Sequence, residues 1–307
     1  MSPTTESAPR ASGGLRAALG AYLLWGFAPL YWRLVDEIPA DQLTAHRVVQ
    51  TLVLCGVVLW RLPAASAGLV RPDRQVALRH LLAATLLAGN WVVYVYSVAT
   101  DRVVEASLGY FINPLLSVVL GLVVLGERFG RSVWAAVALA LVGVTVITVD
   151  AGRLPWISLV LASTFAIYGL VRKQSPLGAF PGLALEMAWL TPVSVALMLW
   201  WGADGSLDLG PSPWLLPGIG LMTAAPLLLF GQATRTVPLW QIGMLQFLAP
   251  SILFGLGVFA FGEEVSVGRV IGFAFIWGGL GLFAADTVAR GRRAAVNARV
   301  EGRVAQR

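Results

Sequence analysis

Charged residues are scarce in this sequence of 307 residues, of which only 12% are Asp, Glu, Lys or Arg. Hydrophobic residues make up 57% of the chain, and the mean hydropathy is +0.76. A soluble globular protein of this length needs a more polar surface than such a composition supplies. The composition therefore predicts an integral membrane protein.

Residues that form metal centres and catalytic sites are also rare. The single cysteine, Cys55, lies in an apolar run, which excludes an internal disulfide and a cysteine-based metal cluster. The only two histidines, His46 and His80, are too few for a His-rich metal site. The sequence has no HExxH or GxSxG motif, no paired aspartates and no P-loop. We therefore expect no cofactor, no metal and no catalytic residue, and ATP-driven transport would need another subunit.

Ten apolar runs are long enough to cross a bilayer core of about 30 Å, which takes about 20 residues of helix. The first run exceeds the apolar core of a signal peptide, so it is expected to be a retained helix. The connections are too short for a soluble domain, and residues 1–14 and 290–307 are expected to be solvated tails. The predicted helices span residues 15–34, 42–61, 77–98, 104–125, 131–149, 155–172, 180–201, 214–234, 240–261 and 269–289.

The distribution of basic residues predicts the orientation. With the amino terminus in the cytoplasm, most of the 22 Lys and Arg fall on the cytoplasmic side, as the positive-inside rule requires. Both termini are then cytoplasmic. The net charge of +6 is a signal of topology, so we expect no nucleic-acid partner. The basic residues on the external side are Arg33, Arg102, Arg153 and Arg269.

The two halves of the chain repeat each other. The stretch GYFINPLLSVVLGLVVLGER (109–128) recurs as LQFLAPSILFGLGVFAFGEE (245–264), with Pro114 aligned to Pro250. The chain is therefore interpreted as two five-helix units, at 15–149 and 155–289. Since five is odd, the second unit enters the membrane from the opposite side. Inverted repeats of this kind place a solute site near the bilayer midplane and open it alternately to each side, which predicts a transporter.

Three stretches carry a family resemblance: AYLLWGFAPLYWRLVDEIPADQLTAHRVV, GNWVVYVYSVATDRVVEASLGYFINPLLSVVLGLVVLGERF and FAIYGLVRK. They resemble the RarD proteins, the chloramphenicol-sensitivity branch of the EamA-like drug/metabolite transporter superfamily. The resemblance implies two EamA repeats, cytoplasmic termini, a bacterial inner membrane and secondary transport, often export. Members of the superfamily carry amino acids, nucleotide metabolites and drugs, so the resemblance specifies no substrate.

The two repeated prolines are expected near the middle of their helices. Each removes a backbone hydrogen bond and frees the carbonyl four residues earlier, which should face protein or a cavity. Pro114 and Pro250 are then either paired hinges around a solute site or kinks supported by neighbouring helices. Tyr110 and Asn113, beside Pro114, are expected to offer polar contacts in the cavity.

Arg47 lies within a membrane helix, where a charged side chain costs about 2.5–3.5 kcal/mol on insertion scales. It is expected to pair with Glu105, which begins a helix from the same side, to form a gate or ion pair. The alternative is that Arg47 snorkels to the interface. Glu186 lies nearer the other side of the membrane, where its candidate partners are Arg172, Lys173 and Arg235.

Two residues are candidates for coupling a proton to transport. His46 shares a helix face with Gln42 and Gln50, and it is either a hydrogen-bonded structural residue or a titrating one. Glu105, if it is unpaired and desolvated, would hold a proton more tightly and could carry it. At the end of the repeat, Glu127 and Glu263 are expected to brace helix ends.

Aromatic and polar side chains are expected to form the solute cavity, although packing between helices would explain the aromatic ones equally well. The predicted function is secondary export of small amphipathic metabolites or drugs, and the alternative is a membrane-embedded enzyme or a solute receptor that uses the same cavity. The partners are a small-molecule solute, the lipid bilayer and, if transport is coupled, protons, while the oligomeric state stays open. The predicted cavity residues are Trp25, His46, Arg47, Asn90, Trp91, Tyr94, Tyr110, Asn113 and Tyr168.

Overall fold

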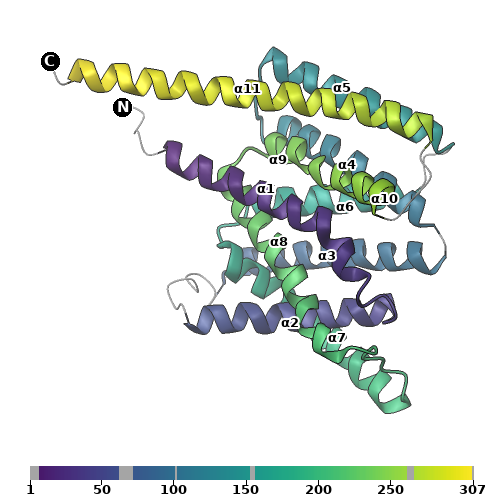
Figure 1. Ribbon diagram of the computed structural model, residues 1–307. Coiled ribbons are helices and arrows are strands. Elements are labelled where there is room, and N and C mark those ends of the chain that lie inside the picture. Colours follow the sequence, from purple (N-terminus) through teal and green to yellow (C-terminus); the bar gives the residue numbers. More distant parts are fainter. Residues whose placement is uncertain (1–6, 62–71, 101, 153–155, 261–265, 306–307) are drawn as a thin grey trace. The chain divides into compact units, whose positions relative to one another are not determined.

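The computed structural model describes residues 7–61, 72–100, 102–152, 156–260 and 266–305, and within these ranges it is helical without a strand (Figure 1). Nine helical spans in the described residues are long and apolar enough to cross a membrane. With α1, which is 26 residues long, they account for the ten predicted helices. The elements are α1 (Ser7–Trp32), α2 (Ala40–Arg61), α3 (Arg74–Ala99), α4 (Val103–Val123), α5 (Arg131–Asp150), α6 (Trp156–Lys173), α7 (Ala179–Asp204), η2 (Pro213–Leu215), α8 (Leu216–Thr236), α9 (Leu239–Gln246), α10 (Leu248–Phe259) and α11 (Val267–Ala305).

Two helices differ from the prediction in their extent or continuity. The predicted helix 240–261 is divided at Phe247 into α9 and α10. Pro250 then lies in the first turn of α10, where a missing amide costs little. Pro114, in contrast, lies inside the unbroken α4. The predicted tail after residue 289 is also helical, because α11 continues to Ala305.

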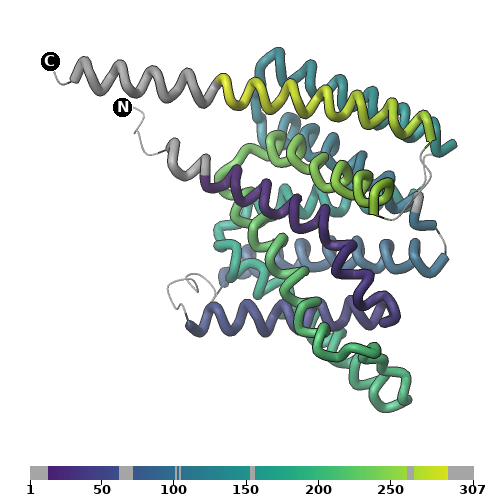
Figure 2. The backbone as a smooth tube through the Cα atoms, viewed as in Figure 1, coloured from purple at the N-terminus to yellow at the C-terminus, as the bar shows by residue number. Residues whose placement is uncertain are grey.

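Contacts between Cα atoms divide the chain into two compact units, one of which contains α5 and α11 and the other the remaining helices. This grouping differs from the two sequence repeats because each unit takes equivalent helices from both halves of the chain. The repeat boundaries at 15–149 and 155–289 therefore remain a prediction about duplication. The backbone tube of Figure 2 lets the reader follow the course of the chain through each unit.

In the larger unit, one end of the bundle holds the α1–α2 connection (33–39), and we call it the α1–α2 end. Gln42 joins the start of α2 to the α7–α8 connection, since its side chain donates to Ser206 O (2.8 Å) and accepts from Asp208 N (2.8 Å). The Ser158 hydroxyl donates to the carbonyl of Glu105, which places the starts of α4 and α6 together. Helix α2 leads away from the α1–α2 end and α3 leads back to it, so α4 begins there. The α1–α2 end therefore holds the end of α1 and the starts of α4 and α6.

The opposite end of this unit, which we call the α2–α3 end, holds the last residues of α2 and the first residues of α3. Arg79, near the start of α3, donates to the carbonyl of Gln174, just after α6 (3.3 Å). Lys173 Nζ donates to Val237 O, just after α8 (2.7 Å). Helix α6 thus runs towards the α2–α3 end, whereas α1, its equivalent in the first repeat, runs away from it. This opposite direction is the inversion that the odd helix number predicted.

Helix packing in the larger unit repeats the same symmetry. If α1, α2, α3 and α4 correspond to α6, α7, α8 and α9–α10, the contacts occur in matched pairs: α1 packs on α8 as α6 packs on α3, and α4 packs on α6 as α10 packs on α1. The contact of α2 with α8 likewise matches that of α7 with α3, and α2 packs on its own equivalent, α7. The site that such a two-fold arrangement encloses lies between the repeats.

The smaller unit is an antiparallel pair of helices. Ser132, at the start of α5, donates to Asp286 Oδ1 in α11 (2.7 Å), and Ser266, just before α11, donates to Asp150 Oδ2 at the end of α5 (2.5 Å). Between these bonds the backbones touch, since a Cβ atom on Gly143 would lie 2.5 Å from the carbonyl oxygen of Gly272. Small residues permit this close approach, as in many membrane helix pairs.

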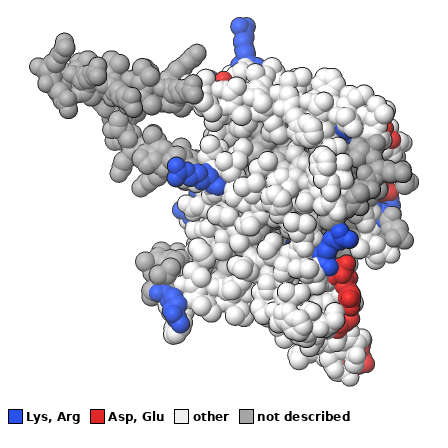
Figure 3. Space-filling model, viewed as in Figure 1, with Lys and Arg blue, Asp and Glu red and all other residues white. Residues whose placement is uncertain are grey.

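The outer surface suits a lipid environment. Large apolar side chains such as Phe27, Leu199 and Phe259 are exposed on the helices. Figure 3 shows one face on which Lys, Arg, Asp and Glu are sparse and uncharged residues predominate. Since lipid tails offer no hydrogen-bond partners, an all-helical backbone is the expected solution.

Candidate functional site

A small cavity lies inside the larger unit, at the side chain of Arg47. Its volume is about 30 Å³, which is enough for a water molecule or two and far below the roughly 300–1,000 Å³ of a ligand pocket. A solute larger than a few atoms would enter only after the helices move apart. The cavity is lined by Trp25, Arg47, Leu87, Trp91, Phe165, Thr223 and Leu227, which come from α1, α2, α3, α6 and α8.

Arg47 is held in this cavity by neutral groups. Its Nε donates to Thr223 Oγ1 (3.1 Å), and that hydroxyl donates in turn to the carbonyl of Ile219 (2.9 Å). The guanidinium carbon lies 4.6 Å from the ring centroid of Trp91 and 5.3 Å from that of Trp32, both within cation–π range. Arg47 is therefore half-buried and held by contacts with three neighbouring side chains.

The predicted ion pair between Arg47 and Glu105 is wrong. Glu105 instead binds Arg102, three residues earlier, whose Nε and NH2 lie 2.9 and 2.6 Å from the two carboxylate oxygens. This bidentate bond raises the pKa of the Arg102 guanidinium above its ordinary value. Arg47 was predicted as the partner because it lies at a similar depth in the membrane. Arg102 precedes Glu105 by three residues at the start of α4, so its side chain lies closer to the carboxylate.

The structure brings together part of the predicted cavity. Trp25, Arg47 and Trp91 line it. Tyr94 and Tyr110 do not line it, and Tyr110 is exposed, but both lie close enough to Arg47 for an electrostatic interaction. These five residues come from α1, α2, α3 and α4, and their part in binding a solute stays a prediction.

The other predicted cavity residues make contacts elsewhere. The Asn90 side-chain amide donates to Leu161 O and Thr164 Oγ1 (both 2.9 Å), so it joins α3 to α6. Asn113 is buried and accepts a long hydrogen bond from Ser117 within α4 (3.4 Å). His46 is buried, and its Nε2 has no hydrogen-bond partner in the described residues. None of these three lines the cavity that the structure describes.

An aromatic wall closes the cavity towards the α2–α3 end. Trp25 and Phe165 meet edge to face with centroids 5.5 Å apart, and Phe230 packs on both at 5.8 and 5.3 Å. Tyr168, one turn further along α6, stacks on Phe230 at 6.0 Å. Because α6 runs towards the α2–α3 end, the wall separates the cavity from the polar groups that follow Tyr168.

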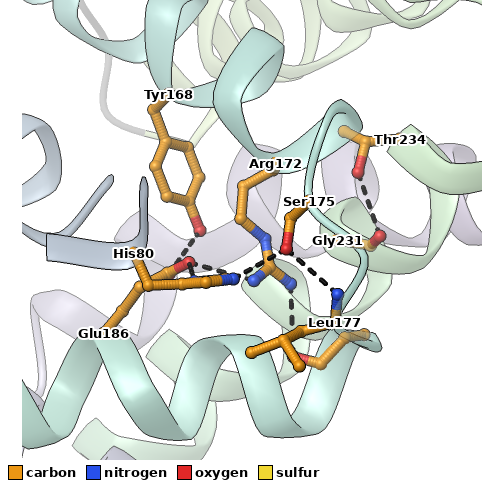
Figure 4. A network of polar contacts seen from close by, with 9 residues as sticks. His80, Tyr168, Arg172, Ser175, Leu177, Glu186, Gly231 and Thr234 are labelled. Atoms are coloured by element: carbon orange, nitrogen blue, oxygen red, sulfur yellow. Dashed lines mark hydrogen bonds and ion pairs between the residues drawn. The ribbon is translucent and has the colours of Figure 1, made fainter. Parts of the chain in front are cut away.

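Those polar groups form a buried network around Glu186 (Figure 4). One carboxylate oxygen, Oε1, accepts from Arg172 NH1 (2.9 Å) and lies 2.9 Å from His80 Nδ1, while Oε2 accepts from the Tyr168 hydroxyl (3.1 Å). Ser175 Oγ lies 2.7 Å from His80 Nε2 and accepts from Leu177 N (3.1 Å). An ionised carboxylate only accepts, so the geometry makes His80 Nδ1 the donor to Glu186 Oε1.

The network joins α3, α6 and α7 at the α2–α3 end. Glu186 and Arg172 are 0% and 2% exposed, so their charges have no solvent to screen them. The pairing of Glu186 with Arg172, one of three candidates from membrane depth, is confirmed. The role of His80 was missed because a single histidine on an apolar helix carries no sequence signal of its partner. Tyr168, predicted as a cavity residue, belongs to this network and to the wall.

Glu127 forms a second closure at the α2–α3 end. Its carboxylate accepts from the backbone amides of Leu239 (2.8 Å) and Trp240 (3.0 Å), the first residues of α9, and lies 3.6 Å from Lys173 Nζ. A carboxylate at this position satisfies orphan amides and complements the helix dipole. The expectation that Glu127 braces a helix end is confirmed, whereas Glu263, its equivalent, lies outside the described residues.

Replacing Glu127 by alanine is expected to destabilise the protein by about 1 kcal/mol, because α9 loses its cap. Glu127→Gln, which keeps an acceptor without the charge, is expected to cost less. The measurement is the free energy of unfolding in detergent micelles. Glu37→Gln, at an exposed acidic residue, is the matched control, and equal stability of Glu127→Ala and the wild type would contradict the capping role.

Comparison with known proteins agrees with the architecture. Residues 12–149 match the EamA-like transporter family. The chain is similar to Protein RarD of Streptomyces exfoliatus, with 42% identity over 286 residues, which cover 91% of this chain and 90% of that protein. It is also similar to Protein RarD of Escherichia coli K12, with 39% identity over 287 residues, which cover 91% and 96% of the two chains. A solved crystal structure with 19% identity covers 91% of this chain and 98% of its own with a TM-score of 0.71, which shows the fold alone.

Proposed function

Since this chain belongs to the RarD family of EamA-like transporters, and is thus a multi-pass membrane transporter and not an enzyme, we propose that it exports small amphipathic solutes by alternating access. The observation that carries this proposal is the cavity between inverted repeats, which is blocked towards one end by an aromatic wall and a buried polar network. Such a site changes its exposure when one set of helices rocks against the other.

We place the α2–α3 end in the cytoplasm of a bacterium, with the protein in the inner membrane. The basic residues Arg74, Arg79, Lys173 and Arg235 lie at this end of the larger unit, which supports the placement by the positive-inside rule. Both termini are then cytoplasmic. The conformation described here is closed to the cytoplasm by the wall and the network, and export requires that this end opens to admit the solute.

Opening the cytoplasmic end would separate contacts between the two repeats. Glu127 follows α4 of the first repeat, whereas its partners on α9 and α6 belong to the second. The hinge proposal for Pro250 is supported by the interruption at Phe247, which leaves α9 and α10 as separate rigid segments. Pro114 lies opposite α9, because a Cβ atom on Gly243 would lie 2.7 Å from the Pro114 carbonyl oxygen.

For proton coupling, the proposal retains His46 and Glu105 as candidates. His46 is supported by its Nε2, which has no hydrogen-bond partner in the described residues, whereas burial disfavours the protonated ring, so a proton would be taken up only when the helices open to water. Glu105 is bound by Arg102, so a proton would reach it only after that ion pair opens. Replacing each residue by glutamine separates the two candidates.

The test is uptake of labelled solutes, including chloramphenicol and amino acids, into inside-out vesicles with and without an imposed pH gradient. Accumulation of at least one solute only when the lumen is acidic is the expected result, with vesicles that lack the protein as the control. Uptake that is indifferent to the gradient would make the protein a facilitator. Uptake confined to right-side-out vesicles would contradict export.

A further inference from the structure

We propose that the Arg47 cavity recognises an organic anion, specifically a carboxylate attached to a flat apolar group. This inference rests on the proposed function, because it takes the cavity as the solute site. It adds the chemical class of the solute and, of the two roles predicted for Arg47, keeps the cavity residue and drops the gate that pairing with Glu105 would have made.

The first support is that the charge of Arg47 has no counter-charge within ion-pair distance among the residues that the structure describes. Its partners among the described residues are the Thr223 hydroxyl and the rings of Trp32 and Trp91, all of them neutral. Three acidic side chains on nearby helices are bound elsewhere: Glu105 by Arg102, Glu186 by Arg172, and Asp204 by Trp200 and Ser206. A cation held in a membrane protein without a neutralising partner is costly, and a bound anion offsets that cost.

The second support is the part of the guanidinium that remains available. Nε is bound to Thr223, and neither terminal nitrogen of Arg47 forms a hydrogen bond in the described parts of the chain. Both nitrogens also retain some accessible surface, since buried side-chain atoms without a partner are limited to Tyr22, His46 and Arg172 in the same residues. Two adjacent N–H donors in one plane match the two oxygens of a carboxylate.

The third support is the aromatic lining. The two tryptophans beside the guanidinium hold its orientation, so the donors need little reorganisation when an anion binds. Trp25 and Phe165 line the same cavity, and when the helices move apart they would offer aromatic surface to a flat apolar group. A solute with a ring and a carboxylate would place the ring on these two residues and the carboxylate on Arg47.

The opposing interpretation is that Arg47 only braces α2 against α8 through Thr223. A structural arginine would affect stability without distinguishing an anionic solute from a neutral one. The two interpretations therefore make different predictions for two solutes that differ only in charge: only a binding arginine would favour the anion.

The experiment measures binding of labelled 3-phenylpropionate and 3-phenylpropanamide to the purified full-length protein in nanodiscs at pH 7. These probes share the ring and the chain length and differ in the carboxylate. The wild type is expected to bind the acid at least about tenfold more tightly than the amide, because a bidentate charge-assisted pair is lost with the amide. Acetate, which lacks the ring, is expected to compete weakly.

Variants of Arg47 test which residue supplies the selectivity. Arg47→Gln is expected to bind acid and amide equally, and Arg47→Lys to keep part of the preference because it retains the charge without the planar fork. Arg61→Gln, at an exposed arginine on the same helix, is the matched control and is expected to keep the full preference. A single size-exclusion peak and an unchanged melting temperature show that each variant is folded.

The outcomes distinguish this inference from the proposed export. Equal binding of acid and amide by the wild type, or an unchanged preference in folded Arg47→Gln and Arg47→Lys, would overturn the inference and leave the export of neutral solutes intact. A preference that depends on Arg47, together with no uptake of any solute into vesicles, would support anion recognition and count against export.

Discussion

Replacing Glu186 by glutamine is expected to destabilise the protein by about 3–5 kcal/mol, because the change leaves Arg172 buried without its counter-charge. The same change weakens the acceptor that holds His80 and Tyr168. Arg172 has no alternative anion in the network, and its Nε has no hydrogen-bond partner among the described residues. The measurement is the free energy of unfolding of purified protein in mixed detergent micelles.

A double variant shows that the loss comes from the unpaired charge. Glu186→Gln combined with Arg172→Met removes both charges, so it is expected to recover part of the stability that Glu186→Gln loses. Glu37→Gln, at an exposed acidic residue, is expected to change stability by less than about 0.5 kcal/mol. If the stability losses of the single variants Glu186→Gln and Arg172→Met add up in the double variant, the two charges do not interact and the network is not a unit.

The network also bears on the transport cycle. The Arg172 guanidinium fits because the chain carries glycine opposite it, and a Cβ atom on Gly231 of α8 would lie 2.6 Å from Arg172 NH2. The cytoplasmic closure that we propose therefore combines a charge network on α3, α6 and α7 with a close approach of α8. If the double variant Glu186→Gln, Arg172→Met folds, its transport rate distinguishes two roles of the network. A changed rate would indicate a gate, and an unchanged rate would indicate a structural brace.

Leucine at Gly143 is expected to separate α5 from α11, because its side chain would occupy the space of the Gly272 carbonyl and of Ile276. A Cβ atom alone would lie 2.5 Å from that oxygen and 2.8 Å from Ile276 Cγ1, and backbone gives way less readily than a flexible side chain. Overpacking of this kind costs about 1–3 kcal/mol or more. The effect should be confined to the pair of helices that forms the smaller unit.

Disulfide trapping measures the separation. Cysteines in place of Ser132 and Asp286, which contact each other at 2.7 Å, are expected to cross-link readily in a Cys55→Ala background. Adding Gly143→Leu should sharply lower the yield. Gly281→Leu is the matched control, since a Cβ atom on Gly281 of α11 meets nothing within 4 Å. Equal yields with the two leucines would show that the glycine contact does not hold α5 and α11 together.

The course of the chain through the membrane follows from composition and repetition. A backbone in lipid must satisfy its own hydrogen bonds, so ten apolar runs predict ten helices, and duplication of an odd number of helices predicts inversion. The structure agrees on both points. It differs at Pro250, where the helix is interrupted before the proline, because a proline costs least in the first turn of a new helix.

Sequence reasoning found several residues of the candidate site but fewer of their partners. Arg47, Trp25 and Trp91 were identified by residue type, since a charge or a large aromatic ring inside a helix needs a reason to be there. Thr223 and Phe165 were missed because threonine and phenylalanine are common in membrane helices and carry no such signal. The roles of Arg47, Trp25 and Trp91 in solute binding stay predictions.

By itself the sequence determined that this protein spans a membrane, and it predicted that the halves are inverted copies and that Arg47 either pairs inside the bundle or snorkels to the interface. Only the tertiary structure decided that Glu105 binds Arg102, that His80 binds Glu186, and that the contacts of Arg47 with the described residues are with neutral groups. The physical reason is that hydropathy and spacing specify how deep a residue lies along a helix. The partner of a buried charge depends also on how each helix is rotated and which helix packs beside it, and both are set by the packing of all the helices together.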